Sequence, residues 1–439
     1  MKLGIVTPVG PGHQEAYEAC LQSIQQAWEH DQGGFSELEI LPMWDLQGEF
    51  GRSRRRNDGI AIAAQKNCDW IFFLDADDLM SATAFEEAAP YLDDYDAIWG
   101  NICEMPFGKF DQVRLRGRQL KTTENVDDIL KIDPYLTLQM GHFVKTACAA
   151  SVGFEEAMNT GEDFRYYLQV CGKYRFIKAP CIFFINQRGN HSQGPLSADG
   201  NEWRAAVQRE IRHVLASREL SAEIKLADSR SVFHINNPFD IIQRCLCQGA
   251  FFEQAELLAL KDYVGERKVI VEVGANIGNH TVFYAHHMNP ARIFPFEPNP
   301  HSVALLDKNI RLNRLEGLID RRGIGFGLGS SSRNCHVVQS DMNNLGAARL
   351  EEGGDIQVRT LDEVMHDEPV DFIKIDAEGM EFEVLAGGSA CIAKNRPLIH
   401  VEVWNQGVPQ FEAWMRENRY KLITQVKMVN AVNFLIGPQ

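Results

Sequence analysis

The chain has 439 residues, of which 45% are hydrophobic and 24% are charged, an ordinary composition for a globular protein of two or three domains. Its net charge of −16 argues against nucleic acid binding through a broad basic face. The ten cysteines form no CxxC pair, and this favours buried thiols in a reducing cytoplasm. The longest apolar runs have only the length of strands, and no signal segment opens the chain. We therefore expect no transmembrane segment and a cytoplasmic protein.

Two segments repeat the pattern of an apolar strand, a glycine-rich turn and a helix. The first covers residues 2–28 and the second covers residues 268–288. Two such starts indicate two α/β domains with parallel sheets. The polar stretch at residues 222–237 is the best candidate for the linker. We therefore expect one domain at residues 1–230 and another at residues 231–439.

In the first half, an apolar strand runs directly into three carboxylates, in the sequence Asp69-Trp-Ile-Phe-Phe-Leu-Asp-Ala-Asp-Asp78. Ligands of open α/β sheets bind at the carboxyl ends of the strands. Asp75 and Asp77 offer hard oxygen ligands of the kind that hold Mg²⁺ or Mn²⁺ beside a diphosphate. The alternative is a solvated acidic turn.

Two charged segments lie on either side of this strand. The arginines between Arg52 and Arg56 precede a helical stretch, where they would favour an anionic diphosphate or simply form a solvated basic turn. Downstream, Glu162 and Asp163 open an amphipathic helix. This acidic pair is either a charged helix start or includes a general base.

Taken in order, the elements up to about residue 195 resemble the family 2 glycosyltransferases, which have the GT-A fold. The motifs that carry the resemblance are Thr7-Pro8, Arg56-Asn57-x-Gly59, Leu74-Asp-Ala-Asp-Asp78, Gly153-Phe-Glu, Glu162-Asp163 and a late element at His191. The resemblance implies that Asp75 and Asp77 bind a Mn²⁺ or Mg²⁺ ion and the diphosphate of a nucleotide sugar, with His191 as a further ligand. It makes Asp163 the base that deprotonates the acceptor hydroxyl, in an inverting transfer.

Three further residues are candidates to bind the nucleotide sugar. Thr7 ends the first strand, and Arg56 would stabilise the charge of the leaving diphosphate. The family usually has an Asp-rich turn after its second strand, and Glu39-Ile-Leu-Pro-Met-Trp-Asp45 stands in its place here. Asp45 would then be the only acidic residue at this position to bind the nucleoside. The resemblance therefore does not specify which nucleotide base the donor carries.

In the second half, the strand at residues 269–273 is followed by Gly274-Ala-Asn-Ile-Gly278, and the next strand ends in Glu297. That spacing suits an acid that binds ribose hydroxyls in a nucleotide-binding unit. The GxGxxG pattern is absent, so hydride transfer is the weaker interpretation. Two later strands, at residues 370–375 and 398–402, also end in acidic residues. We expect these strand ends to share one rim of a parallel sheet.

Residues from about 233 to 436 resemble the FkbM-family methyltransferases, which depend on S-adenosylmethionine. The motifs are Glu272-Val-Gly-Ala-Asn-Ile-Gly-Asn-His-Thr281, Phe296-Glu-Pro-Asn-Pro300, Thr360-Leu-Asp362 and Ile373-Lys-Ile-Asp-Ala-Glu-Gly-Met-Glu381. The resemblance implies O-methylation, commonly of sugars. The residues that it places at the cofactor are Glu272, Gly274, Asn276, Gly278 and Glu297. Asp376, Glu378 and Glu402 would face the acceptor, and the identity of the base and the need for a metal stay open.

The two resemblances together predict a GT-A domain followed by a Rossmann-like class I methyltransferase domain. We expect a bifunctional enzyme of glycan assembly, which combines inverting, metal-dependent sugar transfer with O-methylation of a sugar hydroxyl. Its partners would be a nucleotide-sugar donor and a glycan or lipid-linked saccharide acceptor, with peripheral binding at the inner face of a membrane as one arrangement. The alternative is an active methyltransferase with a non-catalytic N-terminal module that binds a nucleotide or carbohydrate.

Overall fold

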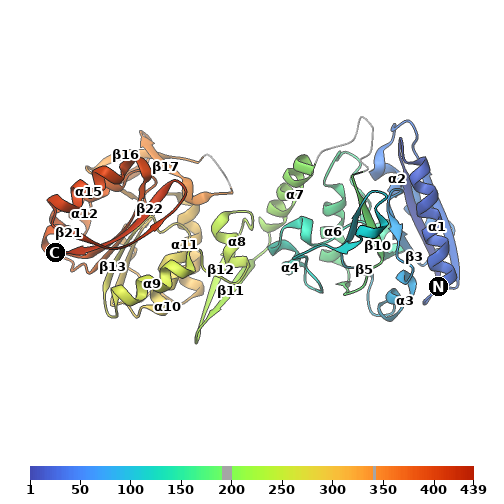
Figure 1. The fold of residues 1–439 in the computed structure, drawn as a ribbon, viewed down its shortest axis with the longest axis horizontal. Coiled ribbons are helices and arrows are strands. Elements are labelled where there is room, and N and C mark those ends of the chain that lie inside the picture. The colour runs from blue at the N-terminus through green and yellow to red at the C-terminus, as the bar shows by residue number, and fades with distance from the viewer. Residues whose placement is uncertain (190–199, 340–342) are drawn as a thin grey trace. The chain divides into compact units, whose positions relative to one another are not determined.

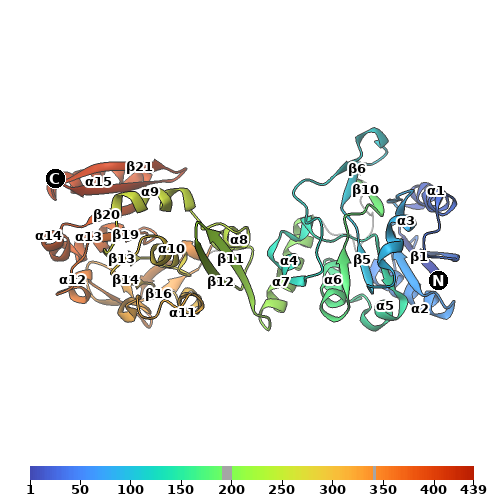
Figure 2. The same cartoon turned by 90° about the horizontal axis from the view of Figure 1, so that it is seen from below.

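The computed structural model describes residues 1–189, 200–339 and 343–439, and these form two compact units, Met1–Ser217 and Arg218–Gln439. Figures 1 and 2 show that each unit combines strands with surrounding helices. Each unit is built on a six-stranded sheet, which confirms the predicted α/β fold class. Among the described residues, no helix has the length and apolar character needed to cross a membrane.

The large sheet of the first unit has the strand order β2-β1-β3-β8-β5-β9. Only β8 runs antiparallel to its neighbours. The strands are β1 (Lys2–Val9), β2 (Glu37–Trp44), β3 (Trp70–Phe73), β8 (His142–Lys145), β5 (Ala97–Trp99) and β9 (Phe176–Lys178). The first predicted strand–turn–helix segment therefore forms β1 and the helix α1 (Gln14–His30).

Helices cover both faces of this sheet because alternate residues of β1 point to opposite sides. Leu3 and Ile5 share a buried cluster with Ile24 of α1. Val6 lies on the other side, against Gly59 of α2 (Gly51–Gln65). A Cβ atom on Gly59 would lie 2.3 Å from Cγ1 of Val6, so the glycine lets α2 approach the sheet closely.

A second, smaller sheet of this unit has the order β4-β10-β6-β7. Its strands are β4 (Leu79–Met80), β10 (Phe184–Arg188), β6 (Cys103–Pro106) and β7 (Arg114–Leu115). The remaining α-helices of the unit are α3 (Ala84–Ala88), α4 (Val126–Lys131), α5 (Thr146–Val152), α6 (Glu162–Lys173) and α7 (Gly200–Leu215).

The second unit opens with a hairpin of β11 (Leu220–Leu226) and β12 (Ser229–Ile235). The predicted boundary at residue 230 falls inside this hairpin. The hairpin packs on helices of the second unit, namely α8 (Ile241–Cys247), α10 (Asn279–His287) and α11 (Pro300–Leu312). The division therefore lies earlier than predicted, because the polar stretch taken as a linker pairs as strands.

The large sheet of the second unit has the order β14-β13-β19-β20-β22-β21, with only β22 antiparallel to its neighbours. Its strands are β13 (Val269–Val273), β14 (Arg292–Phe296), β19 (Phe372–Ile375), β20 (Leu398–Trp404), β21 (Tyr420–Lys427) and β22 (Ala431–Pro438). The first strand in sequence lies between β14 and β19. It marks a topological switch point, where open α/β sheets bind ligands.

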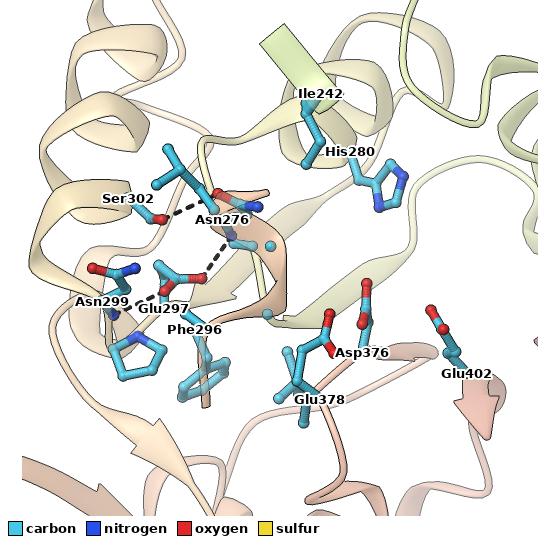
Figure 3. A pocket seen from close by; sticks show the side chains of 18 of the residues that line it. Ile242, Asn276, His280, Phe296, Glu297, Asn299, Ser302, Asp376, Glu378 and Glu402 are labelled. Carbon is cyan, nitrogen blue, oxygen red and sulfur yellow. Dashed lines mark hydrogen bonds between the residues drawn. The ribbon is translucent and has the colours of Figure 1, made fainter. Parts of the chain in front are cut away.

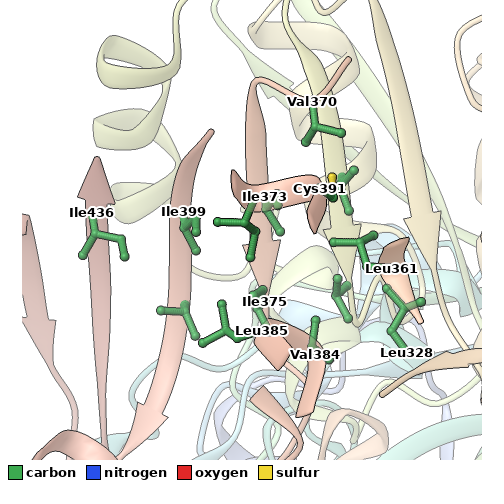
Figure 4. Close-up of a cluster of buried hydrophobic side chains, with 14 of the residues drawn as sticks. Leu328, Leu361, Val370, Ile373, Ile375, Val384, Leu385, Cys391, Ile399 and Ile436 are labelled. Carbon is green, nitrogen blue, oxygen red and sulfur yellow. The ribbon is translucent and has the colours of Figure 1, made fainter. Parts of the chain in front are cut away.

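One buried hydrophobic cluster of this unit includes side chains from one face of the sheet and from the helices that cover it. Figure 4 shows residues of this cluster, which include Ile373, Ile375 and Ile399 from the strands and Val384 and Leu385 from the helix α13 (Glu381–Gly387). The alternate residues of the strands point to the opposite face, toward α10.

The other helices of the second unit are α9 (Gln254–Val264), α12 (Leu361–Val364), α14 (Ser389–Asn395) and α15 (Val408–Glu417). A small sheet of β15 (Gly327–Leu328), β18 (Ile356–Arg359), β16 (Arg333–Val338) and β17 (Arg349–Glu352) is also present.

Candidate functional site

A cavity of about 250 Å³ lies at the carboxyl ends of β13, β14, β19 and β20. It therefore occupies the topological switch point of the second unit. The residues predicted from sequence that line it are Gly274, Asn276, Glu297, Asp376, Glu378 and Glu402. These residues come from four separate strand ends, as the parallel sheet required.

The turn after β13 passes very close to β19. Gly274 has a φ of +79°, and a Cβ atom there would lie 1.9 Å from the carbonyl oxygen of Asp376. The Gly274 amide also donates to the Phe296 carbonyl oxygen at 3.0 Å. The positive φ and the close approach both require a glycine, and this residue links the ends of β13, β14 and β19 at the cavity.

Glu297 is tied to the loops on one side of the cavity (Figure 3). Its carboxylate accepts hydrogen bonds from the backbone amides of Asn276 at 2.7 Å and Asn299 at 2.8 Å. Ser302 in turn donates to the side-chain oxygen of Asn276 at 3.1 Å. Burial raises the pKa of Glu297 to about 7, although these backbone amides favour the ionised form.

Carboxylates gather on the other side of the cavity (Figure 3), on Asp376, Glu378 and Glu402. Burial alone would raise the pKa of Asp376, but the Lys374 ammonium, 2.9 Å away, holds it below its usual value. Burial and the charge of Asp376 raise the pKa of Glu378 to about 7 and that of Glu402 to about 8. On this side, one charged carboxylate thus lies beside two that take up protons near neutral pH, as Glu297 does on the other side.

Two residues predicted to bind the cofactor do not line this cavity. Glu272 points toward α10, where it accepts a hydrogen bond from the Thr281 hydroxyl at 2.6 Å. Its other oxygen has no hydrogen-bond partner within the described residues, and burial raises its pKa to about 7. Gly278 precedes α10 with a φ of +87°. Both residues therefore lie behind the lining of the cavity and do not form part of it.

A second cavity of about 540 Å³ lies between α9 and the strands β20, β21 and β22. It shares Glu253 and Met428 with the first cavity. On its wall, Glu256 makes hydrogen bonds with His400 at 2.8 Å and Asn433 at 3.0 Å. Nδ1 of His400 and Oδ1 of Asn433 are buried without a partner in the described part of the chain. This cavity therefore offers polar groups beside the first one.

In the first unit, the structure brings Arg56, Asp75 and Glu162 together. The buried Arg56 guanidinium contacts Asp75 at 2.7 Å and Glu162 at 3.3 Å. Arg52 also contacts Glu162, at 2.5 Å. Although burial opposes the charged form, the two carboxylates keep the pKa of Arg56 above its usual value. Of the predicted diphosphate residues, Arg56 and Asp75 thus belong to an ion network that the buried Glu162 completes.

Asp163 lies at the start of α6. It accepts hydrogen bonds from the Phe164 amide at 2.8 Å and the Trp203 indole at 3.0 Å. Asp45 accepts three backbone amides of the turn before α2, and it therefore orders that turn. Thr7 is completely buried in β1, and its hydroxyl has no partner among residues that the structure describes.

The predicted metal site is only partly assembled. Asp75 and Asp77 line a cavity of about 810 Å³ together with Asp78, but Asp75 is engaged by Arg56. His191 lies outside the described residues. The described part of the chain contains no group of three or more metal-ligating side chains. These residues therefore do not fit a metal ion held by the protein alone.

Sequence reasoning missed three charged residues of the first cavity. Lys374 is buried in β19 and its ammonium charges the cavity floor. In the sequence it is one polar residue within an apolar strand. Glu253 and Arg349 also line the cavity, and they come from segments that carry no recognised motif.

Comparisons with known proteins place the second unit more closely. Residues 272–422 match the family described as methyltransferase FkbM domain. The hexuronic acid methyltransferase AglP of Haloferax volcanii is 29% identical over 191 residues, which cover 42% of this chain and 76% of that protein. The second unit therefore contains an FkbM-type methyltransferase domain.

Two solved structures are also similar, each with a low TM-score. The structure of S. aureus TarS 1–349 in complex with UDP-GlcNAc has 14% identity, covers 50% of this chain and 68% of that chain, and gives a TM-score of 0.37. The FkbM methyltransferase from Methylobacillus flagellatus has 19% identity, covers 38% of this chain and 43% of that chain, and gives a TM-score of 0.31.

Proposed function

We propose that the second unit transfers a methyl group from S-adenosylmethionine to a hydroxyl of a sugar substrate. The observation that carries the proposal is the cavity at the switch point, where Glu297 faces the carboxylates of Asp376 and Glu378 inside the FkbM domain. The close passage of Gly274 leaves backbone rather than side chain along the wall, which suits a nucleoside ligand. The name of the Haloferax volcanii relative supports a sugar-derived acceptor.

The residues of the cavity divide the chemical work between them. S-Adenosylmethionine supplies a methyl group that a hydroxyl oxygen can displace directly. Each oxygen of Glu297 accepts one backbone amide and keeps capacity to accept a ribose hydroxyl. Glu378, with a pKa near 7, is the better proton acceptor for the attacking hydroxyl. Asp376 stays ionised beside Lys374 and provides negative charge toward the cationic cofactor.

The acceptor would extend toward the second cavity, because Glu253 and Met428 belong to both. Glu256, His400 and Asn433 provide carboxylate, imidazole and amide groups there. Groups of these kinds hydrogen-bond the hydroxyls of a saccharide.

Changing Glu378 to Gln is expected to lower the rate of methyl transfer by about 10²–10⁴-fold, because the hydroxyl proton loses its acceptor. The dissociation constant of S-adenosylmethionine should change only a few-fold. The rate is measured with labelled cofactor and the affinity by calorimetry. Glu412→Gln, at an exposed position of α15, is the matched control. An unchanged rate in Glu378→Gln would remove this residue from the role of base.

Binding of S-adenosylmethionine is expected to tighten by about tenfold between pH 6 and pH 8, as Glu297 loses its proton. Only the ionised carboxylate accepts hydrogen bonds from ribose hydroxyls through both oxygens, so affinity rises with pH. Glu378 and Glu402, whose pKa values are also raised, act in the same direction on a cationic ligand. Calorimetry across this pH range should give a shallower dependence for Glu297→Gln; an equal slope would contradict the assignment.

We also propose that the first unit transfers a sugar from a nucleotide sugar with inversion. The support is the joint placement of Arg56 and Asp75 beside the cavity that Asp77 lines, with Asp163 at the start of α6. Because the residues do not fit a protein-held metal, the proposal assigns the neutralisation of the diphosphate to Arg52 and Arg56. Asp163 would accept the proton of the acceptor hydroxyl.

One observation favours a second candidate function for the first unit. Asp75 forms an ion pair with Arg56, which also pairs with Glu162. A carboxylate that is already paired suits a module that binds a nucleotide without turning it over. Release of nucleoside diphosphate from UDP-, GDP- and dTDP-sugars separates the two, with and without added Mn²⁺. Turnover supports transfer. Calorimetric binding of UDP without turnover of any donor supports the binding module.

Changing Asp163 to Asn is expected to lower sugar transfer by about 10²–10⁴-fold and to leave methyl transfer unchanged. An amide oxygen can still accept from the Phe164 amide and the Trp203 indole, so the fold should persist. Both activities are measured on the same preparation, with the exposed Asp94→Asn as control. Normal sugar transfer by Asp163→Asn would exclude it as the base.

A further inference from the structure

The connection between β6 and β7 exposes a group of large apolar side chains. All ten residues from 106 to 115 are exposed. Among them, Phe107 is 44% exposed, Phe110 66%, Val113 43% and Leu115 52%. Single exposed apolar residues are common, but four within ten residues of one connection indicate an interaction surface.

This connection stands on a rigid base. Glu104 is buried, and its carboxylate accepts hydrogen bonds from Arg116 at 3.0 Å and Arg188 at 3.2 Å. The Phe107 amide donates to the carbonyl oxygen of Arg188 at 2.8 Å. Figure 2 shows the connection projecting from the first unit beyond β6 and β10. An ion network around the buried Glu104 and a backbone hydrogen bond to β10 thus anchor the base of this connection.

Basic residues surround the apolar side chains. Residues 106–121 contain five basic residues and one acidic residue, a net charge of 5 − 1 = +4 in a chain whose total is −16. Lys109, Arg118 and Lys121 are exposed and take part in no ion pair within the described residues. Aromatic side chains flanked by free cations are the composition of segments that lie in the interface of an anionic bilayer.

We propose that residues 106–121 form a docking segment for an anionic lipid surface, with Phe107 and Phe110 entering the interface. Because the rest of the chain is strongly acidic, this segment would also set which face meets the membrane. Pro106, Gln112 and Arg114 line the cavity that holds Asp75 and Asp77. The docked segment would therefore bring that cavity beside a lipid-linked acceptor. This last consequence rests on the proposed sugar transfer, whereas the docking does not.

The test is co-sedimentation of the full-length protein with vesicles of phosphatidylcholine, alone or with phosphatidylglycerol. The protein should bind the anionic vesicles, and less so at high salt. Phe107→Ser with Phe110→Ser should weaken this binding by about tenfold or more, because the apolar anchors are lost. Lys109→Gln, Arg118→Gln and Lys121→Gln together should weaken binding to anionic vesicles by a similar factor.

A matched control removes exposed apolar side chains elsewhere. Leu312 is 43% exposed and Leu422 is 47% exposed, and Leu312→Ser with Leu422→Ser should bind vesicles like the unchanged protein. Thermal unfolding checks that all variants fold. The proposal is overturned if the unchanged protein stays in the supernatant with anionic vesicles, or if the phenylalanine variant sediments equally well. Self-association lost in that variant, without vesicle binding, would instead make the patch a protein contact. The assay needs no sugar transfer, so failure of that activity leaves its result intact.

Discussion

Gly274→Ala is expected to abolish binding of S-adenosylmethionine, with a loss of affinity of at least about 100-fold, or about 2.7 kcal/mol. The added Cβ would lie 1.9 Å from the carbonyl oxygen of Asp376, a backbone atom that cannot move alone. The Gly274 amide also bonds to Phe296, so any shift would displace Glu297 along with Asp376. Both sides of the cavity would change together. Calorimetry with the cofactor gives the affinity, and labelled cofactor gives the rate.

Two other glycines provide graded controls for this prediction. Gly265 also has a positive φ, +75°, but a Cβ there would meet nothing within 4 Å. Gly265→Ala should cost about 1–2 kcal/mol of unfolding free energy through backbone strain and leave cofactor affinity intact. In Gly278→Ala, the added Cβ would lie 2.8 Å from a methyl group of the flexible Leu306 side chain. Its loss of cofactor affinity should therefore lie between those of Gly265→Ala and Gly274→Ala. If Gly265→Ala and Gly274→Ala lost equal cofactor affinity, backbone strain alone, without the clash, would explain the loss.

Arg56→Gln is expected to lower the unfolding free energy of the first unit by about 3–5 kcal/mol, because it leaves two carboxylates near each other without their buried cation. Arg56 contacts Asp75 and Glu162, and Glu162 is almost completely buried. The measurement is denaturant unfolding followed by tryptophan fluorescence. Five of the seven tryptophans lie within Met1–Ser217, so this signal reports mainly on the first unit.

The same helix supplies the control, and pH supplies a second check. Arg54 is exposed and pairs with Asp58 and Glu156, so Arg54→Gln should cost no more than about 1 kcal/mol. In Arg56→Gln, the uncompensated carboxylates should bind protons more readily when folded. The deficit should therefore be smaller at pH 5 than at pH 8. A deficit that grows as the pH falls would contradict the role assigned to the ion network.

Local sequence patterns predicted much of the fold and of the cavity in the second unit. The strand at residues 269–273 was predicted from its apolar run, and the turn after it from its glycines. Both signals lie within a few residues of the chain, and the structure confirms both elements. Glu297, Asp376 and Glu402 end parallel strands and meet at one edge, as strand geometry dictates.

Other features depend on alternation or on distant segments. Glu272 is one residue before the end of its strand, so its side chain faces α10 rather than the cavity. The hairpin of β11 and β12 is polar on alternate positions and resembled a linker. The pairing of Arg56 with Glu162 joins residues far apart in the sequence, and no local period encodes such a contact. Asp376 and Glu272 keep the pKa of the buried Lys374 above its usual value, and the pattern of a single strand does not reveal such a pairing.

The most direct test of the account is the fate of the methyl group when the intact chain meets labelled S-adenosylmethionine and a panel of saccharides. We expect the label to appear as a methyl ether on a sugar hydroxyl. We also expect little label with Glu378→Gln and none with Gly274→Ala. Failure of the unchanged protein to bind the cofactor would contradict the proposed methyl transfer. So would transfer of the label to RNA or protein while every saccharide stays unlabelled.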